Sequence, residues 1–409
     1  MIVDATYKME NIPVRFRGNP LIEALPEIMK PIALLKLLAL KPKHDLAMSK
    51  RTPAHVRIYD VPCLKELYVP PPVAMEFCVS VDQMLLNSYG GRHPFSRDTQ
   101  EWLHSPVEMM RIQGAFSDTL QGMVFVIGGS GMGKTRLVRV CLSRYPQCIS
   151  HTSYKGREFN QMQVVWISVE VPSTGSFKTL MHRLFSALDD ALGQPGKPDS
   201  YVVEHEDSSV DTMLLKFADA AKNHFLGLIH IDDLQRSLEV HSGKAIVKFI
   251  IQLASVLKCP VIFSATEEVT EMFEDIKKFE SSRRAIKEGS FYMHRAASAD
   301  DPFFSRLFVE AMKWQWTDEP IAPSEPLKKL LFNMCVGITA LFVFLHTQAQ
   351  TRALMLGAAA LKLEHYVHVY RYGLRPLRRV LHAIRNGQSH QPKEIEEFLK
   401  AVSDPPPGG

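Results

Sequence analysis

The sequence has few features of a secreted, membrane-spanning or zinc-stabilised protein. Its six cysteines are scattered without a C-x-x-C pair, so reduced cysteines and no structural zinc are expected. The longest apolar run, residues 31–40, contains Lys36 and has about half the length that crosses a bilayer. The first residues lack a basic segment followed by an apolar one, so we expect no secretion signal. These absences favour a soluble, cytoplasmic protein without a membrane partner.

Positive charge is concentrated in two stretches of the sequence, although the net charge is small. The 409 residues are 46% apolar and 22% charged, as in globular proteins with two or three domains. The net charge of +4 is too small to indicate a partner. Residues 119–157, however, contain no acidic residue, and a second basic stretch lies near the C-terminus. Either stretch suits a polyanion, and the second is equally compatible with a solvated helix face. The basic residues are Lys134, Arg136, Arg139, Arg144, Lys155 and Arg157 in the first stretch and Arg371, Arg375, Arg378, Arg379 and Arg385 in the second.

The order of apolar segments predicts an α/β core followed by helices. Recurring prolines in residues 1–75 predict a loosely organised N-terminal arm, to which we assign partner binding. Residues 76–300 alternate strands and helices, which predicts a parallel sheet. Residues 301–390 predict a helical domain, and residues 391–409 a C-terminal tail. The expected strands are 123–127, 164–169, 226–231 and 261–265; the expected helices are 135–144, 177–192, 212–224 and 244–257 in the core and 303–314, 326–334, 338–353 and 365–382 after it.

A phosphate-binding loop is the clearest motif in the sequence. Residues 128–135 read GGSGMGKT and fit the pattern G-x-x-x-x-G-K-[ST] completely. Glycines let successive backbone N–H groups turn toward phosphate oxygens, and the following helix adds the positive end of its dipole. Lys134 would neutralise the β- and γ-phosphates of ATP, and the Thr135 hydroxyl would coordinate Mg²⁺. The predicted ATP-binding residues are Gly128, Gly129, Ser130, Gly131, Met132, Gly133, Lys134, Thr135 and Arg136.

A strand that ends in two carboxylates follows about a hundred residues later in the sequence. The apolar segment 226–231 leads into Asp232 and Asp233, which is typical of a Walker B element. Asp232 would hold Mg²⁺ through water, and Asp233 would act as the general base on the attacking water. The second carboxylate of such ATPases is usually Glu. Because Asp is one methylene shorter, slow hydrolysis is expected.

Three further residues are candidates for the catalytic site. Thr266, at the end of the strand 261–265, would sense the γ-phosphate or orient the water, although hydroxyl residues are common at strand ends. Arg283 and Arg284 would offer an arginine finger to the nucleotide of a neighbouring subunit, or form an ordinary surface pair. A helical domain after the sheet favours an oligomeric AAA+ ATPase. A small-molecule kinase would instead need an acceptor site, which the sequence does not indicate.

Several segments together resemble the TnsC/TniB family of AAA+ transposition regulators. Residues 17–26, RGNPLIEALP, are similar to the opening signature of the family, and residues 232–235 to its IDEIQ segment. Residues 282–289, with the arginine pair, resemble its SARR element. Residues 307–316 and 337–354 resemble two stretches of its helical domain. The resemblance extends from Gly18 to about Gly387, and Asp233 departs from it by replacing the usual Glu.

The resemblance implies a function in target-selecting or CRISPR-associated transposition. ATP-bound subunits with Mg²⁺ would assemble as a homo-oligomeric ring or filament on double-stranded DNA in the bacterial cytoplasm. The assembly would link a TniQ/TnsD-type target selector to a TnsA/TnsB-type transposase. The expected DNA contacts lie in two loops that leave neighbouring strands on the face of a ring's pore; the alternative is that these are ordinary solvated loops. These residues are Lys155, Arg157, Thr174, Gly175 and Lys178. A helicase loader of the AAA+ class remains the alternative.

Overall fold

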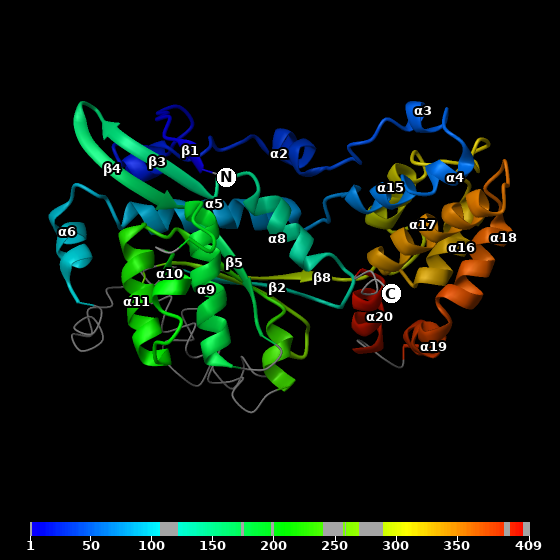
Figure 1. Cartoon of the computed structure of the whole chain (residues 1–409). Helices are drawn as coiled ribbons and strands as arrows, with labels where there is room; N and C mark the ends of the chain where they lie inside the picture. The colour runs from blue at the N-terminus through cyan, green and yellow to red at the C-terminus, as the bar shows by residue number, and fades with distance from the viewer. Residues whose placement is uncertain are drawn as a thin grey trace. The chain divides into compact units, whose positions relative to one another are not determined.

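The computed structural model describes residues 2–106, 122–172, 176–197, 200–239, 257, 259–269, 289–387 and 393–403. The chain divides into two compact units, which are described separately. The sheet unit comprises Met1–Lys30, Met75–Ile127 and Val138–Tyr292. The helical unit comprises Pro31–Ala74, Gly128–Leu137 and Met293–Gly409. Both units are drawn in Figure 1. Boundaries of functional domains near residues 75, 300 and 390 stay a prediction.

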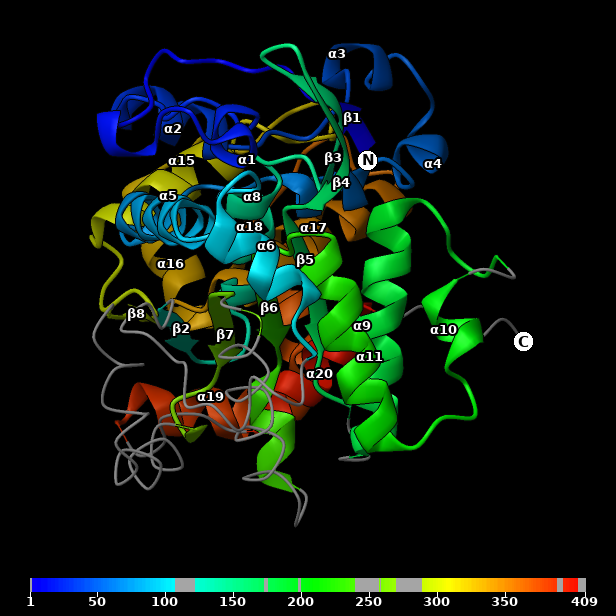
Figure 2. The same cartoon turned by 90° about the vertical axis from the view of Figure 1, so that its left-hand side faces the viewer.

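The sheet unit is built on a five-stranded sheet with the order β5-β6-β7-β2-β8. Neighbouring strands β2 and β7, β7 and β6, and β6 and β5 run parallel. Helices α9 and α11 lie side by side in both views of the chain (Figures 1 and 2). The elements are β2 (Met123–Gly128), β5 (Trp166–Glu170), β6 (Leu228–Asp232), β7 (Val261–Ala265), β8 (Ser290–Met293), α5 (Ala74–Gly90), α6 (Arg97–His104), α8 (Lys134–Leu142), α9 (Phe177–Leu192), α10 (Tyr201–Glu204), α11 (Val210–Asn223) and η3 (Leu234–Glu239).

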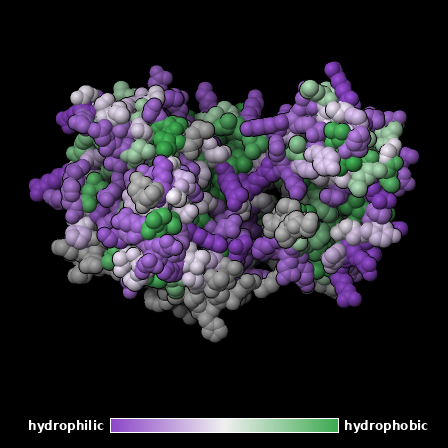
Figure 3. Space-filling view, viewed as in Figure 1, coloured by the Kyte–Doolittle hydropathy of each residue, from purple (hydrophilic) through white to green (hydrophobic). Residues whose placement is uncertain are grey.

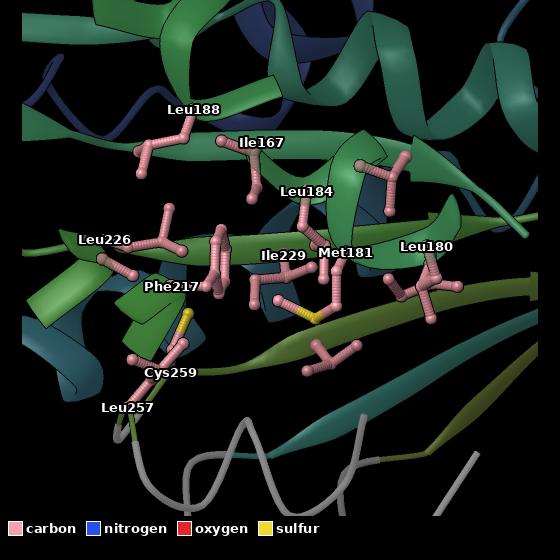
Figure 4. Close-up of a cluster of buried hydrophobic side chains, with 14 of the residues drawn as sticks. Ile167, Leu180, Met181, Leu184, Leu188, Phe217, Leu226, Ile229, Leu257 and Cys259 are labelled. Carbon is pink, nitrogen blue, oxygen red and sulfur yellow. The ribbon is translucent and has the colours of Figure 1, made fainter. Parts of the chain in front are cut away.

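Both faces of this sheet are buried. On one face, Ile167 of β5 and Ile229 of β6 pack with Leu184 of α9 and Phe217 of α11 in a single apolar layer (Figure 4). Side chains that alternate with these along the strands point to the other face, and those of Val124 and Val126 in β2 are fully buried as well. Burial on two sides explains why these strands are nearly continuous apolar runs in the sequence.

The predicted core elements are found close to their expected positions. Helix α9 and strand β7 have the predicted bounds, and β2 is one residue longer than expected. Strands β5 and β6 begin two residues later than predicted and end one residue later. The expected helix 244–257 lies outside the described residues, apart from its last position.

A second sheet was not predicted from the sequence. Strand β1 (Ile2–Asp4) pairs in parallel with β3 (Cys148–Tyr154), which forms an antiparallel hairpin with β4 (Arg157–Val164). Lys155 and Gly156 connect the hairpin, and both have positive φ, 49° and 79°. Two consecutive positive φ angles give the turn a twist that matches paired strands, and glycine adopts them at little cost.

The segment RGNPLIEALP supports this hairpin. Its Glu23 is fully buried at the end of α1 (Pro20–Glu23). One carboxylate oxygen accepts a hydrogen bond from the Tyr154 hydroxyl at 2.7 Å, and the other accepts one from the backbone N–H of Gly18 at 2.7 Å. Asn19 caps α1 and donates its side-chain amide to the carbonyl of Tyr89 at 2.7 Å. The segment therefore connects the hairpin to the end of α5.

The helical unit combines residues 31–74 with the C-terminal helices. Arg57 is buried and donates to the carbonyl of Trp316 at 2.8 Å and to the carboxylate of Asp318 at 2.7 Å. The expected helix 365–382 is divided into several turns, and a final helix was not predicted. No single helix in the described ranges is long and apolar enough to cross a membrane, although the bent pair α16 and α17 passes by length and composition. The elements are α2 (Pro31–Leu38), α3 (Leu46–Ser49), α4 (Ala54–Arg57), η2 (Val61–Glu66), α15 (Pro302–Ala311), α16 (Glu325–Cys335), α17 (Thr339–Met355), α18 (Leu363–His368), η4 (Val369–Gly373), η5 (Arg375–Leu377), α19 (Arg378–Arg385) and α20 (Lys393–Ser403), with η1 (Val14–Phe16) in the sheet unit.

Arg92 gives a test of the sheet unit. Its buried guanidinium donates to the carbonyls of Leu226 at 2.8 Å and Ser88 at 3.1 Å. The change Arg92→Ala should lower the free energy of unfolding by at least about 2 kcal/mol, because each of the two buried carbonyls left unpaired costs about 1–3 kcal/mol. Urea denaturation measures this. Arg97→Ala is the control, since Arg97 forms an exposed pair with Glu101, and it should change stability by less than about 0.5 kcal/mol. Equal effects of both changes would contradict the assignment.

His346 gives a pH test of the helical unit. It is fully buried in α17 between the Tyr366 hydroxyl and the carbonyl of Ala311, and burial lowers its pKa from 6.5 to about 4. The unfolded chain therefore binds a proton that the folded chain excludes between these two pH values. Stability should fall as pH decreases from 6.5 to about 4, by up to about 1.4 kcal/mol per pH unit. Unfolding of His346→Gln should show a shallower slope in this window, whereas the exposed control His382→Gln should keep the wild-type slope.

Candidate nucleotide-binding loop and acidic strand ends

The phosphate-binding loop has the backbone that its glycines permit. Gly131 and Gly133 have φ of 79° and 92°, values that residues with a side chain rarely adopt. Lys134 begins α8, is largely buried and donates its ammonium to the carbonyls of Gly128 at 2.8 Å and Gly129 at 3.2 Å. The lysine therefore lies over its own loop, where a phosphate would replace these carbonyls as its partner.

The middle of the phosphate-binding loop, at Gly131, contacts other segments of the helical unit. The backbone N–H of Ala340, in α17, donates to the carbonyl of Gly131 at 3.0 Å. A Cβ atom at Gly131 would meet the side chains of Leu399 at 2.8 Å and Ile338 at 3.1 Å. Leu399 belongs to α20, which the sequence analysis took as part of a tail. The loop is thus packed against two segments more than 200 positions away in the sequence.

Arg136, a predicted ATP-binding residue, has partners in the helical unit. Its guanidinium donates to the carbonyls of Lys65 and Glu66 and lies over the ring of Tyr68, 5.6 Å from the centroid. Burial lowers the pKa of the guanidinium, and it remains charged. These contacts connect the first turn of α8 with residues 65–68. A direct contact of Arg136 with ATP stays a prediction.

Asp232 lies at the end of β6 in the sheet unit. Its side chain is almost fully buried, and one carboxylate oxygen accepts the backbone N–H of Asp233 at 3.1 Å. Asp232 pairs in register with Glu170, the last residue of β5. Strand β2, which leads into the phosphate-binding loop, ends at the same edge of the sheet because these strands are parallel. A carboxylate has the oxygen chemistry that Mg²⁺ prefers, and its use together with the Thr135 hydroxyl stays a prediction.

Asp233 has partners that the sequence analysis missed. Its backbone is left-handed, with φ of 54°. One carboxylate oxygen pairs with Arg236 at 2.7 Å, and the other accepts the side-chain amide of Gln235 at 3.1 Å. Arg236 also contacts Glu170 at 3.4 Å, and Glu170 lies 4.0 Å from Arg139. The predicted general base is therefore part of a charge network, and the positive charge of Arg236 beside it makes the carboxylate a weaker base toward water.

A row of polar side chains crosses the sheet just before the strand ends. His230 of β6 is hydrogen-bonded to Ser168 of β5 at 2.8 Å and to Ser264 of β7 at 2.9 Å. Burial lowers the pKa of His230 to about 3, so the ring is neutral at physiological pH. The ring lies 4.0 Å from the carboxylate of Asp232, but the two do not form an ion pair because the ring is uncharged. The three side chains satisfy one another and fix the register of β5, β6 and β7.

Thr266 follows β7 directly, between the ends of β6 and β2 in the strand order. It is buried, and its hydroxyl has no hydrogen-bond partner among the described residues. A buried hydroxyl without a partner is costly and therefore uncommon unless it serves a ligand. This agrees with the predicted role of Thr266 in sensing phosphate or orienting water. No cluster of three or more metal-binding side chains occurs within the described part of the chain.

The structure describes three of the five residues predicted to contact DNA, Lys155, Arg157 and Lys178. Lys155 and Arg157 lie at the turn of the β3–β4 hairpin, so the prediction that they leave the main sheet beside a pore was wrong. Lys155 contacts Glu23 at 3.8 Å and the ring of Tyr154 at 4.8 Å. Lys178 is exposed in the first turn of α9. The remaining candidates, Thr174, Gly175, Arg283 and Arg284, lie outside the described residues.

Comparison with known families identifies the domain type. Residues 118–273 match the family model described as AAA domain. This range includes the phosphate-binding loop, Asp232 and Thr266. Together with the strand order, the match shows an AAA+ P-loop fold with a parallel sheet, followed by a helical C-terminal region. The predicted fold class is confirmed, and nucleotide binding and ATPase activity follow in general terms from the domain type.

Solved structures resemble the chain only distantly. The ORC1 protein of Aeropyrum pernix, in complex with DNA, has a TM-score of 0.44 and 14% identity over 73% of this chain and 77% of its own. The ORC2 protein of Aeropyrum pernix has a TM-score of 0.43 and 11% identity over 76% of this chain and 81% of its own. A Walker-type ATPase of Pyrococcus abyssi has a TM-score of 0.41 and 13% identity over 76% of this chain and 87% of its own. TM-scores below 0.5 carry no functional assignment. No curated protein matches the sequence.

The unpartnered hydroxyl of Thr266 gives a test of the site. The change Thr266→Val keeps the shape and removes the buried hydroxyl. It should raise the free energy of unfolding by about 1 kcal/mol, because an unpaired buried polar group is lost, and it should slow ATP hydrolysis at least about tenfold. Phosphate release and urea denaturation measure the two effects. Thr212→Val in α11 is the control, and unchanged hydrolysis in Thr266→Val would contradict a role for this hydroxyl.

Proposed function

We propose that this chain is an ATP-dependent, DNA-binding regulator of transposition that assembles as a homo-oligomer on duplex DNA. The observation that carries the nucleotide part is the joint ending of β2, β7 and β6 at one sheet edge. One strand leads into the phosphate-binding loop, and the others end beside Thr266 and Asp232. Binding of ATP with Mg²⁺ requires these groups in these positions. The arginines of the C-terminal basic stretch support a polyanionic partner.

The transposition part rests on the sequence resemblance and on the ordered N-terminal segment. Residues 17–26 resemble the family signature, and their Glu23 supports the hairpin through Tyr154. A structural role of this kind gives a physical reason for the motif. We therefore retain a TniQ/TnsD-type selector and a TnsA/TnsB-type transposase as proposed partners. A helicase loader is the alternative, and the partner that binds in a pull-down distinguishes the two.

In this proposal, bound ATP controls whether the subunits assemble on DNA, and its hydrolysis does not drive mechanical movement. Lys134 is bound to its own loop carbonyls, and ATP would draw it to the phosphates. Asp233 is held by Arg236 at 2.7 Å, which opposes its use as a general base. ATP would therefore remain bound for long periods, and the bound state would persist on DNA. Arg283 or Arg284 would complete the site from a neighbouring subunit.

The proposal predicts that Lys134→Ala abolishes nucleotide-dependent assembly on DNA. The change removes the charge that neutralises the β- and γ-phosphates, and we expect ATP affinity to fall at least about a hundredfold. Assembly is measured by sedimentation or electron microscopy with duplex DNA and a non-hydrolysable ATP analogue. The control is Lys313→Ala, since Lys313 pairs with Glu310 on the surface of the helical unit. DNA assembly that ignores nucleotide and survives Lys134→Ala would refute the proposal.

A further inference from the structure

The C-terminal basic stretch folds into one face of a short helical segment. Leu377, Leu381 and Ile384 are buried and repeat at helical spacing. The basic residues and the histidine of the segment are exposed, and they lie on the other side of the helical turns from these apolar residues. The exposed residues are Arg375, Arg378, Arg379, His382 and Arg385. The segment, η5 with α19, is thus apolar toward the helical unit and cationic toward solvent.

This face has no acidic neighbour in the sequence. No aspartate or glutamate occurs between Glu364 and Glu394. Elsewhere in the helical unit, Lys313 pairs with Glu310 and Lys400 pairs with Glu396. An ordinary solvated helix face carries both signs of charge in this way. The segment 371–385 departs from that pattern.

The arginines of the segment are also free of ion pairs. In the described portion of the chain, Arg371, Arg375, Arg378 and Arg379 are exposed and form no salt bridge. Arg385 donates to the carbonyl of Asn333 at 2.6 Å, which leaves its charge uncompensated. The surface at the position of α19 is hydrophilic in Figure 3. Mutual repulsion among these cations costs free energy in the isolated chain, and an anionic partner would remove it.

An aromatic side chain adjoins the arginines. Tyr372 is 65% exposed, and its ring lies 4.5 Å from that of His368. A tyrosine left in solvent beside arginines presents a hydroxyl donor and a flat ring to a partner. Tyrosine hydroxyls are among the common donors to phosphate oxygens of DNA. Both kinds of residue therefore suit the same polyanion.

We propose that the exposed residues Arg371 and Tyr372 of η4, together with Arg375, Arg378 and Arg379 of η5 and α19, bind the phosphate backbone of duplex DNA. The inference rests on the proposed DNA-binding function and assigns it a surface outside the AAA domain match. Residues 371–379 follow successive turns of η4, η5 and α19, and at about 1.5–2.0 Å per residue they extend about 12–16 Å, which corresponds to about four phosphates along one strand. Arginine guanidinium groups bind phosphate oxygens in pairs, and the contacts carry no base sequence. The face therefore fits sequence-independent binding of duplex.

The test is the salt dependence of DNA binding by the full chain. The variant carries Arg371→Ala, Arg375→Ala, Arg378→Ala and Arg379→Ala. A control variant removes the same charge from other exposed positions of the helical unit through Lys41→Ala, Lys43→Ala, Arg51→Ala and Lys329→Ala. Affinity for a fluorescent duplex is measured with an ATP analogue over a range of salt concentrations. The slope of log affinity against log salt should fall by about 3 to 4 in the variant, because each phosphate contact contributes about 0.9. The control should change the slope by less than about 1.

The possible outcomes separate this inference from the proposed function. If the wild-type chain binds duplex and the four-arginine variant keeps both affinity and slope, the assigned surface is wrong while the DNA-binding function stands. If the wild-type chain does not bind duplex with any nucleotide, both proposals fail. Nucleotide affinity equal to wild type shows that the variant is folded. Single changes to alanine, each expected to reduce the slope by about 0.9, replace the variant if its nucleotide affinity is lost.

Discussion

The parallel register of β5, β6 and β7 is the constraint on which the rest of the structure depends. The sheet is buried on both faces, so a shift by one residue would exchange two packed layers at once. The hydrogen bonds of His230 to Ser168 and Ser264 oppose such a shift from inside the sheet. Because each crossover returns the chain to the same end, the residues that follow the strands gather at one edge. Asp232 and Thr266, which follow the neighbouring strands β6 and β7, lie at this edge because of that register.

Around that edge, the candidate groups are occupied by partners within the protein. Lys134 binds carbonyls of its own loop, Asp233 is paired with Arg236, and Asp232 accepts a backbone N–H. Only the Thr266 hydroxyl, of the groups considered in the described residues, has no hydrogen-bond partner. This arrangement favours a state in which nucleotide must displace internal contacts before chemistry begins. Binding and hydrolysis are then separate steps with different requirements, as expected for a protein that is controlled by its bound nucleotide.

Local sequence patterns predicted what local physics determines. The P-loop, the helix α9 and the strand β7 were found because glycine spacing, periodicity and apolar runs report backbone geometry directly. The β3–β4 hairpin was missed although Lys155-Gly156 permits its turn, since its strands are largely polar and are stabilised by Glu23, distant in the sequence. The pairing of Arg236 with Asp233 and the packing of Leu399 on Gly131 depend on tertiary contacts. No pattern within either segment indicates them.

The helical unit is assembled from three separate stretches of chain, and this limits how the protein can be dissected. Arg57, in the first stretch, is held by Trp316 and Asp318 in the last. The middle stretch contributes Gly131, which is held by Ala340. A fragment cut before residue 300 would leave the buried side chains of residues 31–74 exposed to water and the P-loop without its support. Such truncations would report on aggregation more than on domain function, and a single internal break is better placed at a surface turn such as Lys155-Gly156.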